Sequence, residues 1–561
     1  MVLQEEEVEI NFSRTSLISR LFYFITIILF ISYDSYSQYG YYKDVIKFSH
    51  SFQGGSARIQ GVGGASVSLG GDVSSISQNP AGLGFINRKL ISVGYGVTGN
   101  NSTSNFFGES STVKNNYNQI ENISLVLPIR NKNNYLGNSI SKCPECSKFN
   151  IGFSYSKIKD FSERKFYRGY NDVNSIIDYF LQDSQGVPLS QLGNNEMIPD
   201  IALLQEAYDH YLINPDNDLP GSYFSFIGGF PLQEEEIITE GSINKVSVSA
   251  GSNIRDKIFL GFGFNFYSID YDQRRFYLEN NFEVLDDAGQ WNFEGILDYL
   301  NLNDVFKISG SGASVSAGLI IKPSNSLNIG INYESKTSFN LEEELYSELE
   351  TKYFDYYYEP EDTILRNVIS GTGSTIADYS YKSPSRITIG SSYFYKKFGF
   401  VSAEIDLIDY SSAQIQSYDF NDYVENAEIL RIYRTLAINY RVGLEARLNK
   451  FYLRLGYNFL ADPEKDITNS THSNSLNKKS IGVGFLSNIL TADITFTSIN
   501  KKSVLSPYNL FRDQPVAEFD SNFSKIIFSL GIRINNWQYP IPNVFWDMIF
   551  RFLIVFYSFS I

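Results

Sequence analysis

Few residues of this chain have the types and spacing that enzyme or metal chemistry requires. The three histidines, His50, His210 and His472, lie far apart in the 561 residues. The sequence contains no nucleophile elbow, P-loop or zinc-protease helix. The position three past Gly63, where a dinucleotide-binding loop needs glycine, is Ser66. We therefore expect no enzymatic activity, no metal site and no cofactor.

The two cysteines of the chain form one short motif, Cys143-Pro144-Glu145-Cys146. A redox role would need a thioredoxin-like unit around the pair, and a metal role would need further ligands. The sequence provides neither. We interpret Cys143 and Cys146 as a local disulfide or as two spare thiols.

Charged residues on alternating segments form the third group whose members could act together. In residues 441–448, apolar side chains alternate with Arg441, Glu445 and Arg447. A strand places alternate residues on opposite faces, so these three charges share one face. Charges inside a fold are tolerated only when they are paired or hydrated, so we predict a polar network. Its members are Glu404, Asp406, Arg441, Glu445, Arg447, Arg454 and Arg533.

The elements that position these residues are strands, because period-two alternation dominates from about Lys89 onward. We count about fourteen such segments. They begin near Leu90, Asn122, Phe149, Asn244, Ile258, Ile308, Leu327, Ile387, Phe398, Leu436, Phe451, Ile481, Leu490 and Ile526. Alternation alone fits both a soluble sandwich and a membrane barrel, whose apolar face meets lipid and whose polar face lines the lumen.

The lengths of the connections favour the barrel. Short ones fall near residues 255–256, 323–324, 396–397, 449–450 and 487–488, whereas long ones cover roughly 99–121, 159–241, 270–306, 335–384, 409–434, 461–479 and 499–522. Short periplasmic turns that alternate with long external loops are typical of an up-and-down outer-membrane barrel. The single exception is residues 131–147, a long connection where a short one is expected. We therefore predict an all-β, transmembrane, antiparallel barrel of about fourteen strands.

Composition agrees with this class of protein. Aromatic residues make up 16% of the chain, with 40 Tyr and 44 Phe, as expected for aromatic girdles at two membrane interfaces. The net charge of -16 argues against binding nucleic acid. A mean hydropathy of -0.18 argues against a bundle of transmembrane helices but is compatible with a barrel whose lumen and loops are polar.

Residues 52–85 are rich in Gly and Ser, and they contain residues that start and stop short helical turns, as expected of a compact plug. Asn79 can cap a helical turn, and Pro80 stands where the first position of such a turn tolerates proline. The motif Asn79-Pro80-Ala81-Gly82-Leu83 resembles the hatch motif of the long-chain fatty-acid transporters of Gram-negative outer membranes. In that family an N-terminal hatch plugs a fourteen-stranded barrel, so the resemblance implies the same arrangement here.

The resemblance also implies a function. Members of the fatty-acid transporter family capture a hydrophobic molecule, such as a long-chain fatty acid or an aromatic hydrocarbon, among helical external loops. A hatch movement then releases the molecule sideways between strands. Asn79, Pro80 and Ala81 would hold the hatch to the wall, or would simply fold it. The family has a kink in its third strand, here residues 149–158, where only Gly152 marks one.

These inferences divide the chain into a leader with signal peptide (1–37), a hatch (38–88), a barrel (89–535) and an apolar tail of unknown role (536–561). We expect a monomer in the outer membrane, in contact with lipid and a hydrophobic ligand. Three other functions stay open: secretion or surface anchoring of exported proteins, an outer-membrane enzyme, and a structural surface antigen.

Apolar residues at helical spacing in residues 173–181 and 198–212 predict helices in the longest external loop, and residues 294–302 predict a third. Such stripes pack against the core of the loop itself or form a hydrophobic landing groove.

Overall fold

The computed structural model describes residues 40–129, 148–194, 196–285, 291–293, 295–465 and 473–534. The expected signal peptide, Cys143, Cys146, His472 and the expected apolar tail lie outside the described residues. The chain divides into two compact units, Met1–Lys43 and Asp44–Ile561. The described part of the first unit contains η1 (Tyr41–Lys43). In the portion of the chain that is described, no helix combines the length and apolarity needed to cross a membrane.

Fourteen antiparallel strands of the second unit close a barrel, which confirms the predicted fold class. Each strand pairs with the next one in the ring, and β22 pairs back onto β1 over residues from Lys89 to Asn105, so the ring has no free edge. The strands are β1 (Lys89–Phe106), β2 (Glu109–Ile129), β3 (Lys148–Asp160), β7 (Phe230–Ile254), β8 (Ile258–Leu285), β10 (Leu297–Ser324), β11 (Leu327–Glu334), β15 (Arg386–Tyr395), β16 (Gly399–Ile408), β18 (Ala437–Leu448), β19 (Phe451–Leu460), β20 (Leu476–Leu486), β21 (Leu490–Leu505) and β22 (Ala517–Ile534).

Alternation along each strand separates a lumen face from an outer face. On β18, Val442 and Leu444 are 45% and 42% exposed on the outer face, whereas Arg441 and Glu445 are buried on the lumen face. Apolar side chains on the outside and polar ones on the inside are what a barrel in lipid requires. The strand pattern of the sequence therefore encodes a transmembrane wall.

The strands of the barrel wall fall into a short group and a long group, so one side of the wall is taller than the other. The barrel strands β15, β16, β18, β19 and β20 have 10 to 12 residues, close to the length that spans a bilayer, whereas β7, β8 and β10 have 25 to 28 residues. The expectations that residues 99–121 and 270–306 form loops are therefore wrong, because β1 and β2 occupy all of the first stretch except residues 107–108, and β8 and β10 occupy much of the second. In their extended parts, one face of β8 and β10 packs in a core with the long loops, as Tyr277 and Leu300 do, and the other face no longer meets lipid. The apolar alternation of a lipid-facing strand therefore fades although the strand continues.

Further strands extend the tall wall on the side of the long loops. β4 (Glu163–Tyr170) pairs with β7, and β12 (Ser338–Tyr358) pairs with β10. The others are β9 (Trp291–Phe293), β13 (Thr363–Gly371), β14 (Thr375–Lys382) and β17 (Gln414–Ser417), whereas β5 (Asn214–Pro215) and β6 (Tyr223–Phe224) form a separate two-stranded sheet.

The predicted short turns lie together at one end of the barrel, which we call the short-turn end. Residues 255–257 join β7 to β8, and Arg255 and Asp256 both have φ near +55°. Two successive residues with positive φ form the tight turn that matches the twist of a hairpin. The opposite end carries the long connections, together with the two-residue turn from β1 to β2, and we call it the long-loop end.

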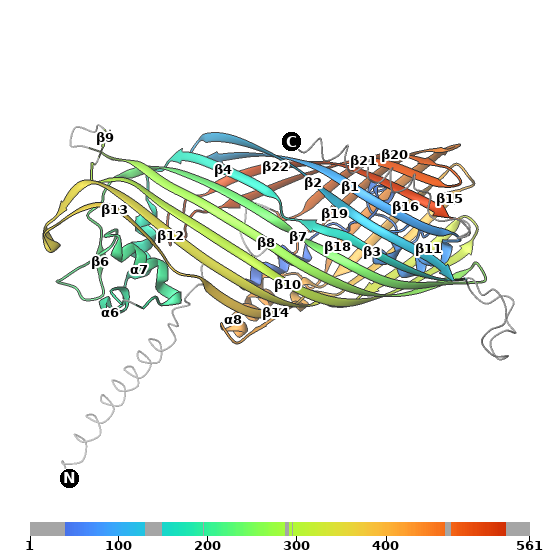
Figure 1. Ribbon diagram of the computed structural model, residues 1–561, viewed down its shortest axis with the longest axis horizontal. Helices are drawn as coiled ribbons and strands as arrows, with labels where there is room; N and C mark the ends of the chain where they lie inside the picture. The colour runs from blue at the N-terminus through green and yellow to red at the C-terminus, as the bar shows by residue number, and fades with distance from the viewer. Residues whose placement is uncertain are drawn as a thin grey trace, which may run out of the picture. The chain divides into compact units, whose positions relative to one another are not determined.

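A plug of short helices lies inside the barrel, and its blue segments are visible behind the strands in Figure 1. We call residues 44–88 the hatch. Its elements are α2 (Asp44–Ser49), α3 (Ala57–Gly61), α4 (Ser75–Gln78) and η2 (Pro80–Phe85). Contacts of η2 with β7, β8 and β10 fix it to the wall.

Helices also occur at the long-loop end, where Figure 1 shows α6 and α7 near β12. The helices are α5 (Ile176–Ser184), α6 (Leu189–Leu192), η3 (Pro199–Ile201), α7 (Ala202–Asp209), η4 (Glu359–Glu361), η5 (Tyr410–Ser412) and α8 (Asp422–Ile432). Two of the three predicted helical patches form helices. The third prediction is wrong, because residues 297–302 begin β10, where strands β8 and β12 pair with both edges.

Candidate functional site: the hatch, its cavity and the adjoining seam

Asn79 joins two parts of the hatch through its side-chain amide. The Oδ1 atom accepts a hydrogen bond of 3.1 Å from the Ala81 backbone N–H, and Nδ2 donates one of 2.6 Å to the Val67 carbonyl. The first bond caps η2, and Pro80 follows at the first position of that turn. One buried side chain thus closes the turn and ties it to a distant segment of the hatch.

The rest of the motif is buried between the hatch and the wall. Ala81 packs with Phe259 and Ile320 of the wall, and Leu83 packs with Ile76 and Val126. Gly82 donates its N–H to the Asn79 carbonyl at 2.9 Å. All five residues of the motif therefore lie at one contact surface, and their proposed role in transport stays a prediction.

A set of lumen-facing glycines makes room for the hatch. A Cβ atom at Gly261 of β8 would overlap the Pro80 backbone, and one at Gly318 of β10 would overlap the Asn79 side chain. The same close approach occurs at Gly152, Gly251, Gly330, Gly443 and Gly456. Sequence reasoning treated some of these residues only as the polar face of a strand. Their recurrence on the inward face of successive strands is the signal that could have shown where the backbone of a plug approaches the wall.

The predicted polar network separates into two clusters. In the first, the Arg441 guanidinium lies 2.6 Å from Asp406 Oδ1 and 3.3 Å from Glu404 Oε2. Glu404 also accepts a hydrogen bond from the Val67 backbone N–H of the hatch. This cluster therefore connects β16 and β18 to the hatch.

Glu445 is the centre of the second cluster. Its carboxylate lies 2.9 Å from both Arg447 and Arg454, and 3.4 Å from Arg58 of the hatch. Arg454 also lies 2.6 Å from Asp493. Sequence reasoning missed Arg58 and Asp493, because the ladder that joins them becomes visible only when the strands are in register. Arg533, the seventh predicted member, belongs to neither cluster.

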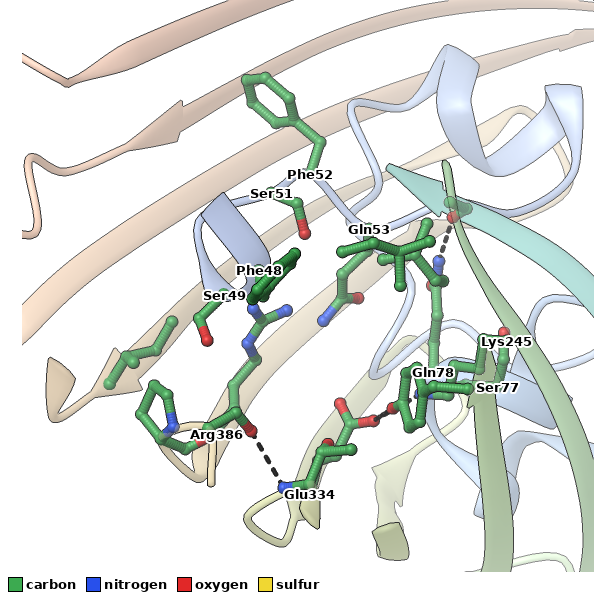
Figure 2. Close-up of a pocket in the computed structure, with 18 of the residues that line it drawn as sticks. Phe48, Ser49, Ser51, Phe52, Gln53, Ser77, Gln78, Lys245, Glu334 and Arg386 are labelled. Atoms are coloured by element: carbon green, nitrogen blue, oxygen red, sulfur yellow. Dashed lines mark hydrogen bonds and ion pairs between the residues drawn. The ribbon is translucent and has the colours of Figure 1, made fainter. Parts of the chain in front are cut away.

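A small cavity of about 90 Å³ lies between the hatch and the wall (Figure 2). We call it the hatch cavity. Its apolar lining comes from Phe48, Phe52, Ile158, Ile243, Phe339, Pro384 and Ile408. Ordinary small-molecule sites occupy roughly 300–1,000 Å³, so a large hydrophobic molecule enters this cavity only if the hatch moves.

Three charged residues give the hatch cavity its polar side (Figure 2). Lys245 forms an ion pair with Glu334 and donates a hydrogen bond of 3.1 Å to the Ser77 carbonyl of the hatch. The hydroxyl of Tyr267 also donates to Glu334. Among the described residues, the guanidinium of Arg386 has no ion-pair or hydrogen-bond partner. An apolar cavity lined by a guanidinium that forms no ion pair with a described residue suits an amphiphile with an anionic head.

The strand ladder is interrupted beside this cavity. β2 pairs with β3 only from Asn122 to Ile129, although β2 begins at Glu109. The register of β3 on β7 shifts between Lys157 and Lys159, and β4 then continues on β7. We call the junction between residues 109–121 of β2 and the β3–β4 segment the seam. The predicted third-strand irregularity is therefore at Lys157, whereas Gly152 faces Ile76 of the hatch.

Side chains, not backbone pairs, cross the seam. Lys157 Nζ donates a hydrogen bond of 2.7 Å to Gln119 Oε1. Above it, β4 lies against β1, with the Ser104 hydroxyl donating to the Phe166 carbonyl at 2.7 Å. Side-chain contacts of this kind open at less cost than a continuous ladder of backbone hydrogen bonds.

The helical segment at the long-loop end buries its own apolar faces. Phe180, Leu212 and Ile213 are fully buried in a core that includes wall residues such as Leu300 and Leu349. The Glu279 carboxylate of β8 accepts hydrogen bonds from the Ser175 hydroxyl at 2.6 Å and the Ile176 N–H at 2.8 Å, which anchors the start of α5. These stripes therefore pack in a core that the loop shares with strands of the wall.

No protein-family profile matches the chain, and no curated protein matches it in sequence. Several solved structures are similar to it in fold. A Pseudomonas aeruginosa FadL homologue has 13% identity and a TM-score of 0.48, with 86% of this chain and 99% of that chain covered. The Pseudomonas putida toluene transporter TodX has 11% identity and a TM-score of 0.47, with 86% and 100% covered. The Ralstonia pickettii toluene transporter TbuX has 13% identity and a TM-score of 0.43, with 86% and 99% covered.

Proposed function

We propose that this protein is an outer-membrane passive transporter of hydrophobic small molecules, with long-chain fatty acids as the first substrate class to test. One observation carries the proposal: Ile158, which lines the hatch cavity, lies at the point where the β2–β3 ladder has ended and the register of β3 shifts. A molecule in the cavity is thus separated from the membrane by the seam.

The route by which the molecule leaves the barrel follows from which exits the hatch blocks. The hatch fills the lumen, so axial passage would require its removal. Sideways passage through the seam needs only the side-chain contacts of Lys157 and a small shift of the hatch. A hydrophobic molecule that leaves sideways enters lipid directly, so it is never exposed to water. Diffusion down a gradient suffices for this step.

Arg386 supports an anionic head group for the substrate. Its guanidinium lines the hatch cavity and has no hydrogen-bonded or ion-paired neighbour in the described part of the chain. Lys245, in contrast, is neutralised by Glu334. The carboxylate of a fatty acid would pair with Arg386 while its acyl chain contacts Phe48 and Phe52.

A cross-link across the seam tests the route. In a background with Cys143→Ser and Cys146→Ser, the pair Gln119→Cys and Lys157→Cys is bridged by a short bis-methanethiosulfonate reagent, which joins the two thiols through reducible disulfides. We expect uptake of radiolabelled oleate to fall at least tenfold and to return when the bridge is reduced.

The matched control bridges Thr103→Cys to Asp520→Cys, which are partners in the continuous β1–β22 ladder. This bridge should leave uptake unchanged. Normal uptake with the seam bridged would refute lateral exit, and so would an equal loss with either bridge. Toluene measured in parallel decides whether the substrate class includes neutral hydrocarbons.

A further inference from the structure

A second cavity, of about 180 Å³, lies between the hatch and the wall toward the short-turn end. Four arginines and three carboxylates line it. They are Arg58, Arg447, Arg454 and Arg533, with Asp72, Glu445 and Asp493. We call it the arginine cavity. Its charges leave one positive charge in excess.

Three of the arginines are neutralised by neighbours. Glu445 holds Arg58, Arg447 and Arg454 in the contacts described above. Arg58 also lies 3.8 Å from Asp72 Oδ2. The other carboxylate oxygen of Asp72, Oδ1, accepts hydrogen bonds of 2.8 Å from the Ser56 hydroxyl and 2.9 Å from the Ser74 N–H. The carboxylates of this cavity are therefore already occupied.

Arg533 is the exception. Its backbone N–H donates to the Ile489 carbonyl at 2.7 Å, which fixes the strand. Its guanidinium lines the cavity but makes no hydrogen bond or ion pair with any described residue. Arg533 is half-buried, so its guanidinium can reach water in the cavity, and an anion there could pair with it directly.

We propose that the arginine cavity binds a small soluble oxyanion, with Arg533 as its principal ligand. A guanidinium presents a planar fork of donors that matches the oxygens of phosphate or a carboxylate. The aromatic ring of Tyr452 lies 5.9 Å from Arg447 and 5.6 Å from Arg454, which holds both guanidinium groups beside the cavity.

The size and position of the cavity decide the class of anion. At ~30 Å³ for each water molecule, its volume corresponds to about six waters, which is enough for phosphate or acetate. The lining residues Arg454, Asp493 and Ser529 face the lumen, away from lipid, so a phospholipid with two acyl chains does not fit. This inference is independent of the proposed transport function.

Binding would couple the hatch to the barrel. Arg58 and Asp72 belong to the hatch, whereas Arg447, Arg454 and Arg533 belong to the wall. An anion held by both parts binds the docked state more tightly than an undocked one and therefore stabilises docking. The anion would act as a removable clamp on the hatch at the short-turn end.

Calorimetric titration of the detergent-solubilised full chain tests the proposal, with inorganic phosphate, acetate and chloride as probes. We expect phosphate or acetate to bind at least tenfold more tightly than chloride, and the comparison of these two identifies the preferred oxyanion. At a concentration of ten times Kd, the hydrogen-exchange protection of the α3 amides should rise about tenfold.

Variants assign the binding to the cavity. Arg533→Gln should weaken binding at least tenfold, and Arg533→Lys should weaken it less, because lysine keeps the charge but loses the fork. Asp493→Asn should tighten binding, since it adds to the positive excess. Arg88→Gln is the matched control, because Arg88 lies nearby and donates to the Asn488 carbonyl outside the cavity.

Two results would overturn the proposal: oxyanion binding no tighter than chloride, or wild-type affinity in Arg533→Gln. If Arg533→Gln fails to fold, the other two variants still test the proposal, because oxyanion affinity should fall in Arg533→Lys and rise in Asp493→Asn.

Discussion

Gly318 on β10 lies so close to Asn79 of the hatch that a Cβ atom at this position would overlap the Asn79 amide oxygen. The two residues are distant in sequence, yet the absence of a side chain at one allows the cap made by the other. The wall and the hatch therefore fit each other at the level of single atoms.

Replacement of Gly318 by valine should displace the hatch. The new side chain forces Asn79 away from the wall, and overpacking of this kind costs about 1–3 kcal/mol. Limited proteolysis of the hatch and urea unfolding in lipid vesicles measure the effect. Ala317→Val is the control, because Ala317 is on the outer face of the same strand and should tolerate the change. Equal protease sensitivity in the two variants would contradict the close fit.

Loss of the Asn79 side chain should loosen the hatch without unfolding the barrel. Asn79→Ala removes the bonds to Ala81 and Val67 and leaves buried backbone groups without partners, which costs about 1–3 kcal/mol. Asn79→Ser keeps an acceptor for the Ala81 N–H and should lose less. Hydrogen exchange across residues 65–85 measures both variants. An alanine variant that exchanges no faster than the serine variant would show that the cap does not hold the hatch.

Replacement of Arg386 should separate two substrate classes. Arg386→Gln removes the cation of the hatch cavity that forms no ion pair with a described residue, and it should lower oleate uptake about tenfold, the effect of losing one charge-assisted contact of roughly 1.4 kcal/mol. Toluene uptake should change little, because toluene carries no charge. Lys397→Gln, in a short turn, is the charge-matched control. Equal losses for oleate and toluene would rule out a role for Arg386 in recognition of the carboxylate.

Much of the barrel could be predicted from the sequence because alternation is a local signal. The predicted starts at Ile258, Leu327, Phe451 and Leu490 coincide with the first residues of four strands. In contrast, the tall part of the wall was missed, because the outer faces of β8 and β10 lose their contact with lipid there, while the other face packs against long loops far away in the sequence. A local pattern reports contact with lipid, but it does not report packing against a distant loop.

The site was less predictable because its contacts join distant segments. The hatch motif carries its own signature in Asn79 and Pro80, so its cap could be foreseen. The pair of Arg58 with Glu445 joins residues 387 positions apart. No spacing rule in the sequence relates these two residues. The position of the seam follows from a register shift at Lys157, which depends on how two other strands pair.

The helical segment at the long-loop end should respond to pH through His210. This residue is fully buried at the end of α7, with Nδ1 2.9 Å from the Thr351 hydroxyl and Nε2 2.6 Å from the Ser370 hydroxyl. Ser370 donates its proton to Glu206, so its hydroxyl oxygen accepts from Nε2–H, and Nε2 lies 3.8 Å from the Glu206 carboxylate. Burial lowers the pKa of His210 from 6.5 to about 4.

The sign of the pH effect follows from that lowered pKa. Above pH 6.5 the imidazole is neutral whether the segment is docked or undocked, so docking is at full strength. Between pH 6.5 and 4 the undocked histidine takes up a proton while the docked one does not, which lowers the stability by up to about 3 kcal/mol. Burial raises the pKa values of Glu206 and Asp209, so their contributions have the opposite sign.

Comparison with His210→Gln isolates the histidine, because glutamine keeps a hydrogen-bond donor and the acids stay the same. Hydrogen exchange of the α7 amides is measured from pH 7 to pH 4 in both proteins and corrected for the intrinsic exchange rate. Wild-type protection should fall by a factor of about 100 more than that of the variant, in accord with the 3 kcal/mol above. If protection falls equally with pH in the wild type and in His210→Gln, His210 does not cause the pH dependence of docking.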